Sequence, residues 1–324
     1  MGASTTVAEL SSNPQVAVCD SKPDAYSLVD KIFHQLSDNE KEQAARASSY
    51  RYLVASSSPT NEGLDQRDRY AKAMIERYVT VEQKLDKRKS PDAWEAAATL
   101  KLKKTLEFRE EKQVDDIRLC FDTDKQSVDD GLHATLRERL TNQFASKGTI
   151  IRGYTKENLA MLLQFPGNDI AWEEEAFIQG NIYMLERALA CTERQSNGEK
   201  DKVVLLFDYN GYGLKNTPPP LLIKLLLSNL RDHWPERLQH VFVVDSPFFF
   251  RAFWAIIKHF IDPITKELVQ FVTGEEQKKI FREMISEDQA APFMFDGGKN
   301  GKDADMSTFF YDTPFDHVYG EESP

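Results

Sequence analysis

Hydrophobic and polar residues follow a helical spacing from Tyr26 to about Cys120. Ser90 is placed to cap a helix whose first turn holds Pro91, and apolar positions then recur at intervals of four residues. Residues at this spacing share one helix face, here Trp94, Ala98, Leu102 and Leu106. This part of the chain therefore predicts a small all-helical lobe.

After a polar stretch at 122–130, short apolar runs alternate with longer helical patterns. The runs are apolar at consecutive positions and rich in Val, Ile, Leu and Phe, which is typical of interior parallel strands. We expect strands at 149–152, 202–208, 240–245 and 268–272, and helices at 131–145, 171–192, 218–232, 248–260 and 275–285. This order predicts an α/β lobe with a mostly parallel sheet.

The same patterns divide the chain into four segments. The first, rich in Ser, Thr, Ala and Pro without periodicity, is expected to be a disordered leader, and the last is acidic with scattered aromatic residues. The predicted boundaries are 1–25 for the leader, 26–125 for the helical lobe, 126–310 for the α/β lobe and 311–324 for the acidic tail.

The helix expected at 248–261 is unusual because its polar residues are limited to Arg251, Lys258 and His259. At ~100° per residue, Arg251 and Lys258 lie ~20° apart, so the polar stripe is narrow. Eight large apolar side chains occupy the remaining arc, whereas a surface helix is typically apolar over only ~100°. Leaving them in water would forgo ~12–24 kcal/mol at ~1.5–3 kcal/mol each, so they must be covered.

Two surroundings would shield the apolar side chains of this helix from water. One is the protein core with a partner helix; the other is a buried apolar ligand on one side and a membrane on the other. Pro263 ends the helix and pushes Asp262 toward extended geometry, so a hinge is possible there. A hinged apolar helix would act as a lid. Such a lid is needed for lipid, because an acyl chain of ~16 carbons carries ~13 kcal/mol of transfer free energy at ~0.8 kcal/mol per methylene.

Composition narrows the classes of partner. With 41 Lys and Arg against 52 Asp and Glu, the net charge of −11 argues against general nucleic-acid binding. The three cysteines, Cys19, Cys120 and Cys191, are widely spaced and predict neither a disulfide framework nor a zinc site, which fits a reducing cytoplasm. Gly2 and Thr6 have the spacing of an N-myristoylation site, although no polybasic stretch follows to supply a second membrane signal.

Catalytic motifs are weak. The stretch "DYNGYGLKN" (208–216) lies between a strand and a helix, as a dinucleotide-binding loop would, but Asn216 occupies the position of the third glycine. We interpret it as a strand-to-helix turn, with Thr217 capping the helix and Pro218 in its first turn. The six histidines show no metal-binding spacing, and the three glutamates at 173–175 are expected on a solvated helix face. No cofactor, metal or catalytic residue is predicted.

One segment resembles the CRAL-TRIO lipid-binding family, which includes the fungal phosphatidylinositol/phosphatidylcholine transfer proteins. The sequence "WPERLQHVFVVDSPFFFRAFWAIIKHFIDPIT" (234–265) is similar to that family's YPER, strand and aromatic gate helix ending in a proline and threonine. The stretches "VLLFDYNG" and "TLEFREE" resemble its pocket strand and the end of its helical lobe more weakly. The resemblance implies a helical lobe on an α/β lobe whose sheet floors a lipid pocket closed by a gate helix.

The resemblance also implies site residues. Glu236 and Thr265 match positions used around a phosphoinositide headgroup, although Glu236 can instead form a local ion pair with Arg237, and Thr265 can instead cap the next short helix. The remaining residues fall in three groups: Val203, Leu205 and Phe207 on the pocket strand; Phe249, Phe250, Phe253, Trp254, Ile257 and Phe260 on the gate helix; and Arg251 and Lys258 as membrane contacts.

The chain departs from the family at the headgroup. Leu268 replaces a headgroup lysine, and Glu82 and Gln83 stand where the helical lobe carries a basic pair. Val203 and Leu205 replace the serine and threonine that hold choline. Losing cations weakens a phosphate site, so we expect a hydrophobic or weakly polar ligand: a sterol, an isoprenoid or a phospholipid held mainly by its chains.

The leading hypothesis is thus a non-enzymatic lipid-binding and transfer protein, cytoplasmic and transiently bound to membranes. Two alternatives stay open. One is an α/β enzyme with a nucleotide or small-molecule site near Asn210 and Asp245, at the ends of strands. The other is a scaffold that uses the fold to bind a partner protein.

Overall fold

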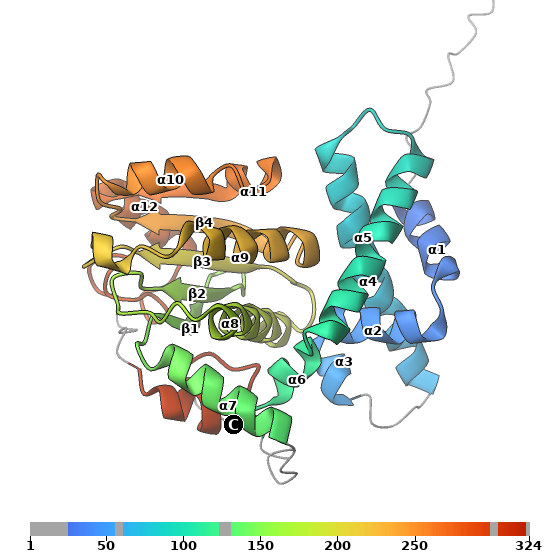
Figure 1. The fold of residues 1–324 in the computed structure, drawn as a ribbon, viewed down its shortest axis with the longest axis horizontal. Coiled ribbons are helices and arrows are strands. Elements are labelled where there is room, and N and C mark those ends of the chain that lie inside the picture. Colours follow the sequence, from blue (N-terminus) through green and yellow to red (C-terminus); the bar gives the residue numbers. More distant parts are fainter. Residues whose placement is uncertain (1–24, 56–60, 123–130, 299–303, 322–324) are drawn as a thin grey trace, which may run out of the picture.

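The computed structural model describes residues 25–55, 61–122, 131–298 and 304–321 and has two lobes side by side (Figure 1). The predicted leader, apart from Ala25, lies outside these residues, as do Gly2, Thr6 and Cys19. The smaller lobe and its linker are wholly helical. Their helices are α1 (Ala25–Gln35), α2 (Asp38–Ser48), α3 (Tyr50–Ala55), α4 (Asn61–Leu85), α5 (Pro91–Glu111) and α6 (Val114–Leu119).

Helix α5 forms as its sequence predicts. The Ser90 side chain accepts a hydrogen bond from the Ala93 amide, and Pro91 occupies the first turn, where a missing N–H costs nothing. The four apolar residues expected on one face, Trp94, Ala98, Leu102 and Leu106, are all buried against α1, α2 and α4. They give the helical lobe a core of its own.

The larger lobe contains a five-stranded sheet in sequential order. Its strands are β1 (Thr149–Tyr154), β2 (Ala160–Gln164), β3 (Val203–Asp208), β4 (Leu238–Val244) and β5 (Val269–Val272). The first pair is antiparallel and the other three pairs are parallel, so the predicted mostly parallel sheet is confirmed. Strand β2 was not predicted: its run of apolar residues resembles those of the other strands but follows β1 after only five residues.

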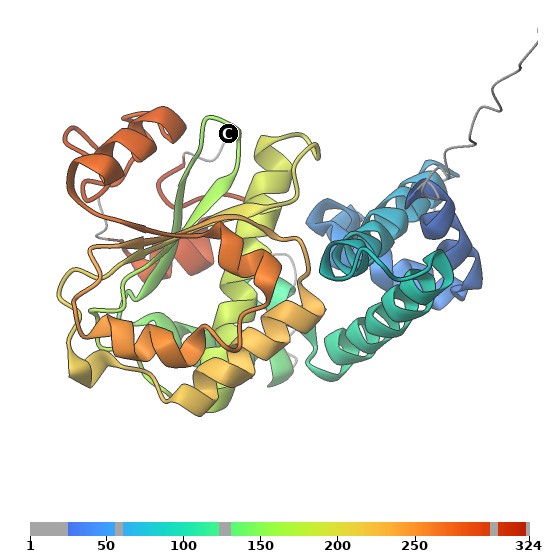
Figure 2. The same ribbon diagram turned by 90° about the horizontal axis from the view of Figure 1, so that it is seen from above.

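Helices cover both faces of this sheet (Figure 2). They are α7 (Gly131–Phe144), α8 (Glu174–Gln195), α9 (Pro220–His233), α10 (Phe250–Ile257), α11 (Pro263–Leu268) and α12 (Gly274–Met284), with short turns η1 (Leu214–Asn216) and η2 (Thr308–Asp312). Helix α12 packs on one face, where Phe281 contacts Phe242 edge to face at 5.1 Å. Helices α9, α10 and α11 lie over the other face.

Two helix starts differ from prediction. Helix α9 begins at Pro220 with Pro219 at its N-cap, not at Thr217 and Pro218, because the 3-10 turn η1 precedes it. Glu173, expected on a solvated helix face, is instead the N-cap of α8: its carboxylate accepts hydrogen bonds from the amides of Glu175 and Ala176. A carboxylate at this position also interacts favourably with the positive end of the helix dipole.

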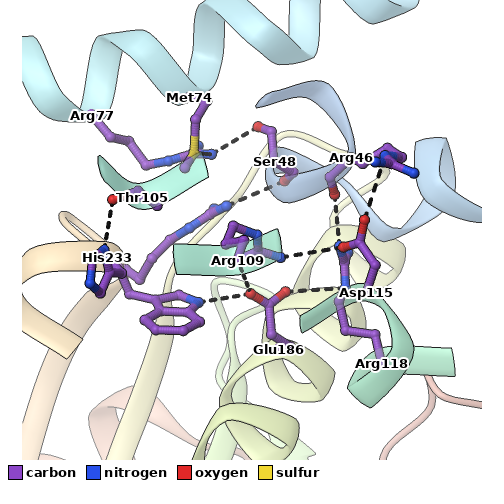
Figure 3. Close-up of polar contacts among 12 residues, drawn as sticks. Arg46, Ser48, Met74, Arg77, Thr105, Arg109, Asp115, Arg118, Glu186 and His233 are labelled. Carbon is purple, nitrogen blue, oxygen red and sulfur yellow. Dashed lines mark hydrogen bonds and ion pairs between the residues drawn. The ribbon is translucent and has the colours of Figure 1, made fainter. Parts of the chain in front are cut away.

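Buried ion pairs tie the two lobes together (Figure 3). Glu186 of α8 accepts a hydrogen bond from Arg109 of α5 at 2.6 Å and one from the Trp234 indole at 2.8 Å, and it lies 3.2 Å from Arg118 of α6. Burial by itself raises the pKa of Glu186, but the two guanidinium groups outweigh it and lower the pKa to about 2. Glu186 is therefore a buried carboxylate that stays charged.

The C-terminal part of the described chain also packs into the larger lobe. Arg187 of α8 is fully buried, donates to the carbonyls of Thr313 and Pro314 at 2.9 and 3.1 Å, and lies 3.8 Å over the Phe309 ring. The Tyr319 amide donates to the Ile151 carbonyl of β1 at 2.9 Å. Residues 309–319 thus complete the core beside α8 and β1.

Candidate functional site

A cavity of about 560 Å³ lies between the sheet and the helices above it. Its floor consists of alternate residues of neighbouring strands, because side chains at i and i+2 of a strand point to the same face. These floor residues are apolar: Leu162, Leu205, Phe207, Val241, Val243 and Val269. The intervening residues, such as Leu206 and Val244, are buried in the core on the other face.

Two helices form most of the roof with the same spacing. Residues at i, i+3, i+4 and i+7 share one helix face, and in both helices all four are apolar and line the cavity. In α9 they are Ile223, Leu226, Leu227 and Leu230; in α10 they are Phe250, Phe253, Trp254 and Ile257. The cavity is therefore apolar above and below.

Helix α10 is the helix that the sequence singles out, although it is shorter than the expected 248–261. Four of its six predicted gate residues line the cavity, and two do not. Phe249 stacks on Tyr212 with ring centroids 5.8 Å apart, and Phe260 lies under the Lys224 ammonium at 5.6 Å. Both side chains pack beside the cavity wall rather than in it.

The other side of α10 faces outward. Arg251 and Lys258 are exposed there, as the narrow polar stripe predicts. Apolar residues are exposed on the same side: Ile256 is 49% exposed, and Phe248, just before the helix, is 85% exposed. Among the described residues, no helix has the length and apolar character needed to cross a membrane.

The predicted pocket strand, β3, contributes two of its three expected residues. Leu205 and Phe207 line the cavity, while Val203 is fully buried in the core and lies outside the cavity wall. The pairing of β3 with β4 shifts register between Val203 and Val204, so Val203 lies before the regular alternation begins.

Glu236 lies at the cavity mouth, where the lobes meet. Its carboxylate accepts hydrogen bonds from the Lys84 ammonium at 2.8 and 2.9 Å and from the Lys202 ammonium at 3.2 Å. The local ion pair with Arg237 does not form, since Arg237 donates to Asp201 instead. Glu236 thus joins α4 of the small lobe to the residue before β3 of the large one.

The cations expected from the resemblance are replaced at Leu268, Glu82 and Gln83, but other lysines are present at the mouth. Lys84, Lys101 and Lys202 all line it. Glu82, expected where a family cation would stand, points away and is buried against Lys101 at 2.5 Å and Lys89 at 3.3 Å. Each of the three lysines at the mouth pairs with a carboxylate, Lys84 and Lys202 with Glu236 and Lys101 with Glu82.

Thr265 and Leu268 both line the cavity from α11, because residues three apart share a helix face. Lys266, on the same helix, is exposed. Thr265 does not cap α11: the N-cap is Asp262, whose carboxylate accepts from the Thr265 amide at 2.9 Å. The Thr265 side chain is therefore not needed as a cap.

The region proposed for the alternative enzyme site is occupied by internal hydrogen bonds. Asp245 accepts from the Thr273 hydroxyl at 2.6 Å, and the Asn216 amide donates to the carbonyls of Gly167 and Asn168 at 3.3 Å. Gly211 supplies the positive φ of 77° that the turn requires. Among the described residues, no group of three or more His, Cys, Asp or Glu is arranged to hold a metal ion.

Comparisons with known proteins identify the larger lobe. Residues 145–294 match the family model described as the CRAL/TRIO domain. The phosphatidylinositol/phosphatidylcholine transfer protein SFH7 of Arabidopsis thaliana is 31% identical over 99 residues, 30% of this chain and 18% of that protein. The SEC14 cytosolic factor of Eremothecium gossypii is 22% identical over 145 residues, 44% of each chain. The matched segments thus span less than half the length of these relatives.

A solved structure shares the architecture of both lobes. The crystal structure of Sfh5 superposes with a TM-score of 0.54 at 15% identity, covering 86% of this chain and 88% of that one. At this identity the likeness shows the fold: a helical lobe beside an α/β lobe of the CRAL/TRIO type.

Proposed function

Because the chain belongs to the CRAL/TRIO lipid-binding family, we propose that it binds a lipid in the apolar cavity, without catalysis, and transfers it between membranes or presents it at one. The observation that carries this proposal is the cavity of about 560 Å³, lined above and below by apolar side chains. Its volume falls in the ~300–1,000 Å³ range of small-molecule sites. Transfer of lipid from water into such a cavity is favourable at ~0.8 kcal/mol per buried methylene.

The ligand is held mainly by its apolar part. Relatives named as phosphatidylinositol/phosphatidylcholine transfer proteins make a phospholipid one candidate class, beside sterols and isoprenoids. The mouth supplies Glu236 and Thr265 as polar contacts, but Lys84 and Lys202 are already paired with Glu236. A phosphate group entering there has to displace that carboxylate, which favours ligands of low charge.

Helix α10 is the gate in this proposal. One of its sides faces the cavity through Phe250, Phe253, Trp254 and Ile257, and the other side is exposed with Arg251 and Lys258. Rotation or displacement of α10 at a membrane would open the cavity where exposed aromatic residues are tolerated. The protein would then be cytoplasmic and transiently membrane-bound, and residues 26–125 and 126–310 would form its two working lobes.

The first test is mass spectrometry of an organic extract from the natively purified protein, with an unrelated protein prepared in parallel. A stoichiometric, enriched lipid supports the proposal and identifies the class. An empty extract, followed by no saturable binding of added phospholipid, sterol or isoprenoid, contradicts it.

The second test addresses the gate. Replacing Phe250→Asp together with Trp254→Asp puts two charges on the cavity wall and should remove retained lipid and vesicle-to-vesicle exchange. The matched control is Ala252→Asp with Ala255→Asp, which adds the same charges to exposed positions of the same helix. Equal lipid retention in the two variants, at unchanged helix content, would refute the role of α10.

A further inference from the structure

A second, smaller cavity lies between the two lobes and has a volume of about 200 Å³. One wall is α4 of the small lobe, where Arg69, Ala73 and Arg77 recur every four residues and therefore share a helix face. The other walls belong to the end of α2, the second half of α8 and the loop 198–201 that leads to β3. We call it the inter-lobe cavity. Three short side chains leave this space open: Ala47, Ala73 and Ala190.

Charged side chains dominate the wall of the inter-lobe cavity, and the cations outnumber the acids. The basic residues are Arg69, Arg77, Arg118, Lys200 and Arg237. The acids are Glu186, Glu193, Glu199 and Asp201. Two of these acids have further partners: Glu186 also pairs with Arg109, and Glu193 accepts hydrogen bonds from the Tyr50 and Arg51 amides at 2.9 and 3.4 Å. The wall therefore carries an excess of positive charge.

This excess falls on Arg77 and Arg237, because both are buried and share the carboxylate of Asp201. Asp201 accepts hydrogen bonds from Arg77 at 2.8 Å and from Arg237 at 3.3 Å, whereas Arg118 has two carboxylates within 3.3 Å. Burial and the positive charge of Arg77 lower the pKa of Arg237 to about 9, although Asp201 acts in the opposite direction. A single carboxylate therefore does not balance the two buried guanidinium groups.

Both guanidinium groups also keep donors for a ligand. Arg77 makes three hydrogen bonds, to Asp201, to the Ser48 hydroxyl at 2.8 Å and to the Met74 sulfur at 3.6 Å (Figure 3). Arg237 also makes three, two to Asp201 and one to the Ser48 carbonyl at 3.3 Å. Because a guanidinium carries five N–H groups, each arginine has two left over within the described part of the chain.

Two further cations line the inter-lobe cavity from exposed positions. They are Arg69 on α4 and Lys200 on the loop before β3, and neither forms an ion pair with a described carboxylate. The small lobe and the large lobe thus each supply one buried arginine and one exposed cation to the same space.

We infer that the inter-lobe cavity binds a phosphate group, either inorganic phosphate or the phosphate of a small phosphomonoester. Such a group carries ~1.5–2 negative charges at pH 7, which matches the excess of cations. Donors approach from α4, from the loop 198–201 and from Arg237 before β4, so the ligand must accept hydrogen bonds from several directions. A phosphate does so with its tetrahedral oxygens, whereas a carboxylate has two oxygens in one plane. The bound anion joins the two lobes.

Isothermal titration calorimetry of the full chain at pH 7 tests this inference, with ionic strength held constant by sodium chloride. Inorganic phosphate and glycerol 3-phosphate are titrated separately. We expect saturable binding of one ligand per chain, and the tighter of the two ligands identifies the source of the phosphate group. Saturable binding of neither overturns the inference and leaves the proposed lipid binding standing, because the apolar cavity is a different site.

Exposed variants locate the site without disturbing the core. Arg69→Gln with Lys200→Gln should weaken binding of the tighter ligand about three- to tenfold. The matched control is Lys87→Gln with Arg88→Gln, the same change of charge at exposed positions outside the inter-lobe cavity. Equal weakening in both double variants would show that net charge alone attracts the anion, and would overturn the assigned site.

A variant of Asp201 gives a change of opposite sign. Asp201→Asn removes the carboxylate that Arg77 and Arg237 share, so the same ligand should bind about tenfold more tightly than to the wild type. The matched control is Asp92→Asn, the same substitution at an exposed position outside the inter-lobe cavity, which should leave the affinity unchanged. Unchanged affinity in Asp201→Asn would overturn the placement of the anion beside the two buried arginines.

Discussion

Lys84 and Glu236 join the two lobes at the cavity mouth, 152 positions apart in the chain and 2.8 Å apart between ammonium and carboxylate. The backbone of Glu236 has a φ of 60°, in the left-handed region that non-glycine residues seldom adopt. This conformation places its carboxylate between Lys84 and Lys202, so that a single acid pairs with two lysines from different lobes.

Replacing Glu236→Gln should therefore change which headgroup the protein prefers. The change keeps the side-chain shape but leaves Lys84 and Lys202 without their carboxylate, so the mouth gains positive charge. We expect the affinity for phosphatidylinositol relative to phosphatidylcholine to rise about three- to tenfold, measured by competition for one fluorescent lipid. The control is Glu267→Gln, an exposed residue outside the cavity wall. An unchanged ratio would mean that headgroups do not reach Glu236.

Glu186→Gln should destabilise the interface between the lobes. It leaves Arg109 and Arg118 buried without their shared carboxylate, which costs about 3–5 kcal/mol in comparable buried pairs. Urea unfolding at pH 7 measures this loss, with the exposed Glu175→Gln as control.

The loss of unfolding free energy caused by Glu186→Gln should also depend on pH. The pKa of Glu186 is about 2 in the folded protein, below its ordinary value of 4.5, so its stabilising charge is fully present above pH 4.5. That contribution fades as pH falls from 4.5 toward 2. The difference between wild type and variant should narrow over this range; a constant difference would show that the carboxylate is not held charged by the two arginines.

His233 should make the protein sensitive to mild acid. Burial against Phe108, whose ring stacks at 3.9 Å, lowers the pKa of His233 to about 4, and the nearby Arg109 adds to the shift. The unfolded chain takes up this proton near pH 6.5 and the folded protein only near pH 4, so stability is lost as pH falls through this interval.

The measurement is the unfolding temperature at pH 7 and pH 5. The unfolding temperature of His233→Gln should fall less between pH 7 and pH 5 than that of the wild type, because the variant has no imidazole to protonate. The exposed His259→Gln serves as the control and should follow wild type. A His233→Gln variant that follows wild type as well would contradict the buried, neutral state of this imidazole.

The sequence carried enough information for the fold and the roof of the cavity, but not for its mouth or for the polar side chains on its wall. Phe250, Phe253, Trp254 and Ile257 lie close together in the chain, so the helical periodicity of the sequence predicts that they share one face. The direction of the Lys84 side chain depends on its position around helix α4. Lys84 lies two residues after Glu82, so the two side chains point ~200° apart about the helix axis. Gln143 and Asn181 are isolated polar residues on different helices, and only tertiary packing brings them to one wall. Their polarity within buried helix faces was the available signal.

The exposed side of α10 should decide membrane association. Reversing Arg251→Glu and Lys258→Glu removes two cations from a face that also presents Phe248. At ~1 kcal/mol per basic residue near an anionic surface, binding to phosphatidylserine-containing vesicles should fall at least tenfold, with little change on neutral vesicles. Vesicle flotation measures this, and Lys200→Glu with Lys279→Glu, exposed elsewhere, gives the control. Equal losses in both double variants would mean that net charge alone governs binding.

The contact between Arg187 and residues 313–314 has a consequence for synthesis on the ribosome. Helix α8 carries a fully buried guanidinium whose carbonyl acceptors, and the Phe309 ring beneath it, are translated more than 120 residues later. The Ile151 carbonyl of β1 likewise accepts a hydrogen bond from the Tyr319 amide, which is translated much later. The helical lobe can fold as it emerges, whereas the larger lobe must hold the Arg187 guanidinium without its two carbonyl acceptors, and an open core, until nearly the whole described chain has been made.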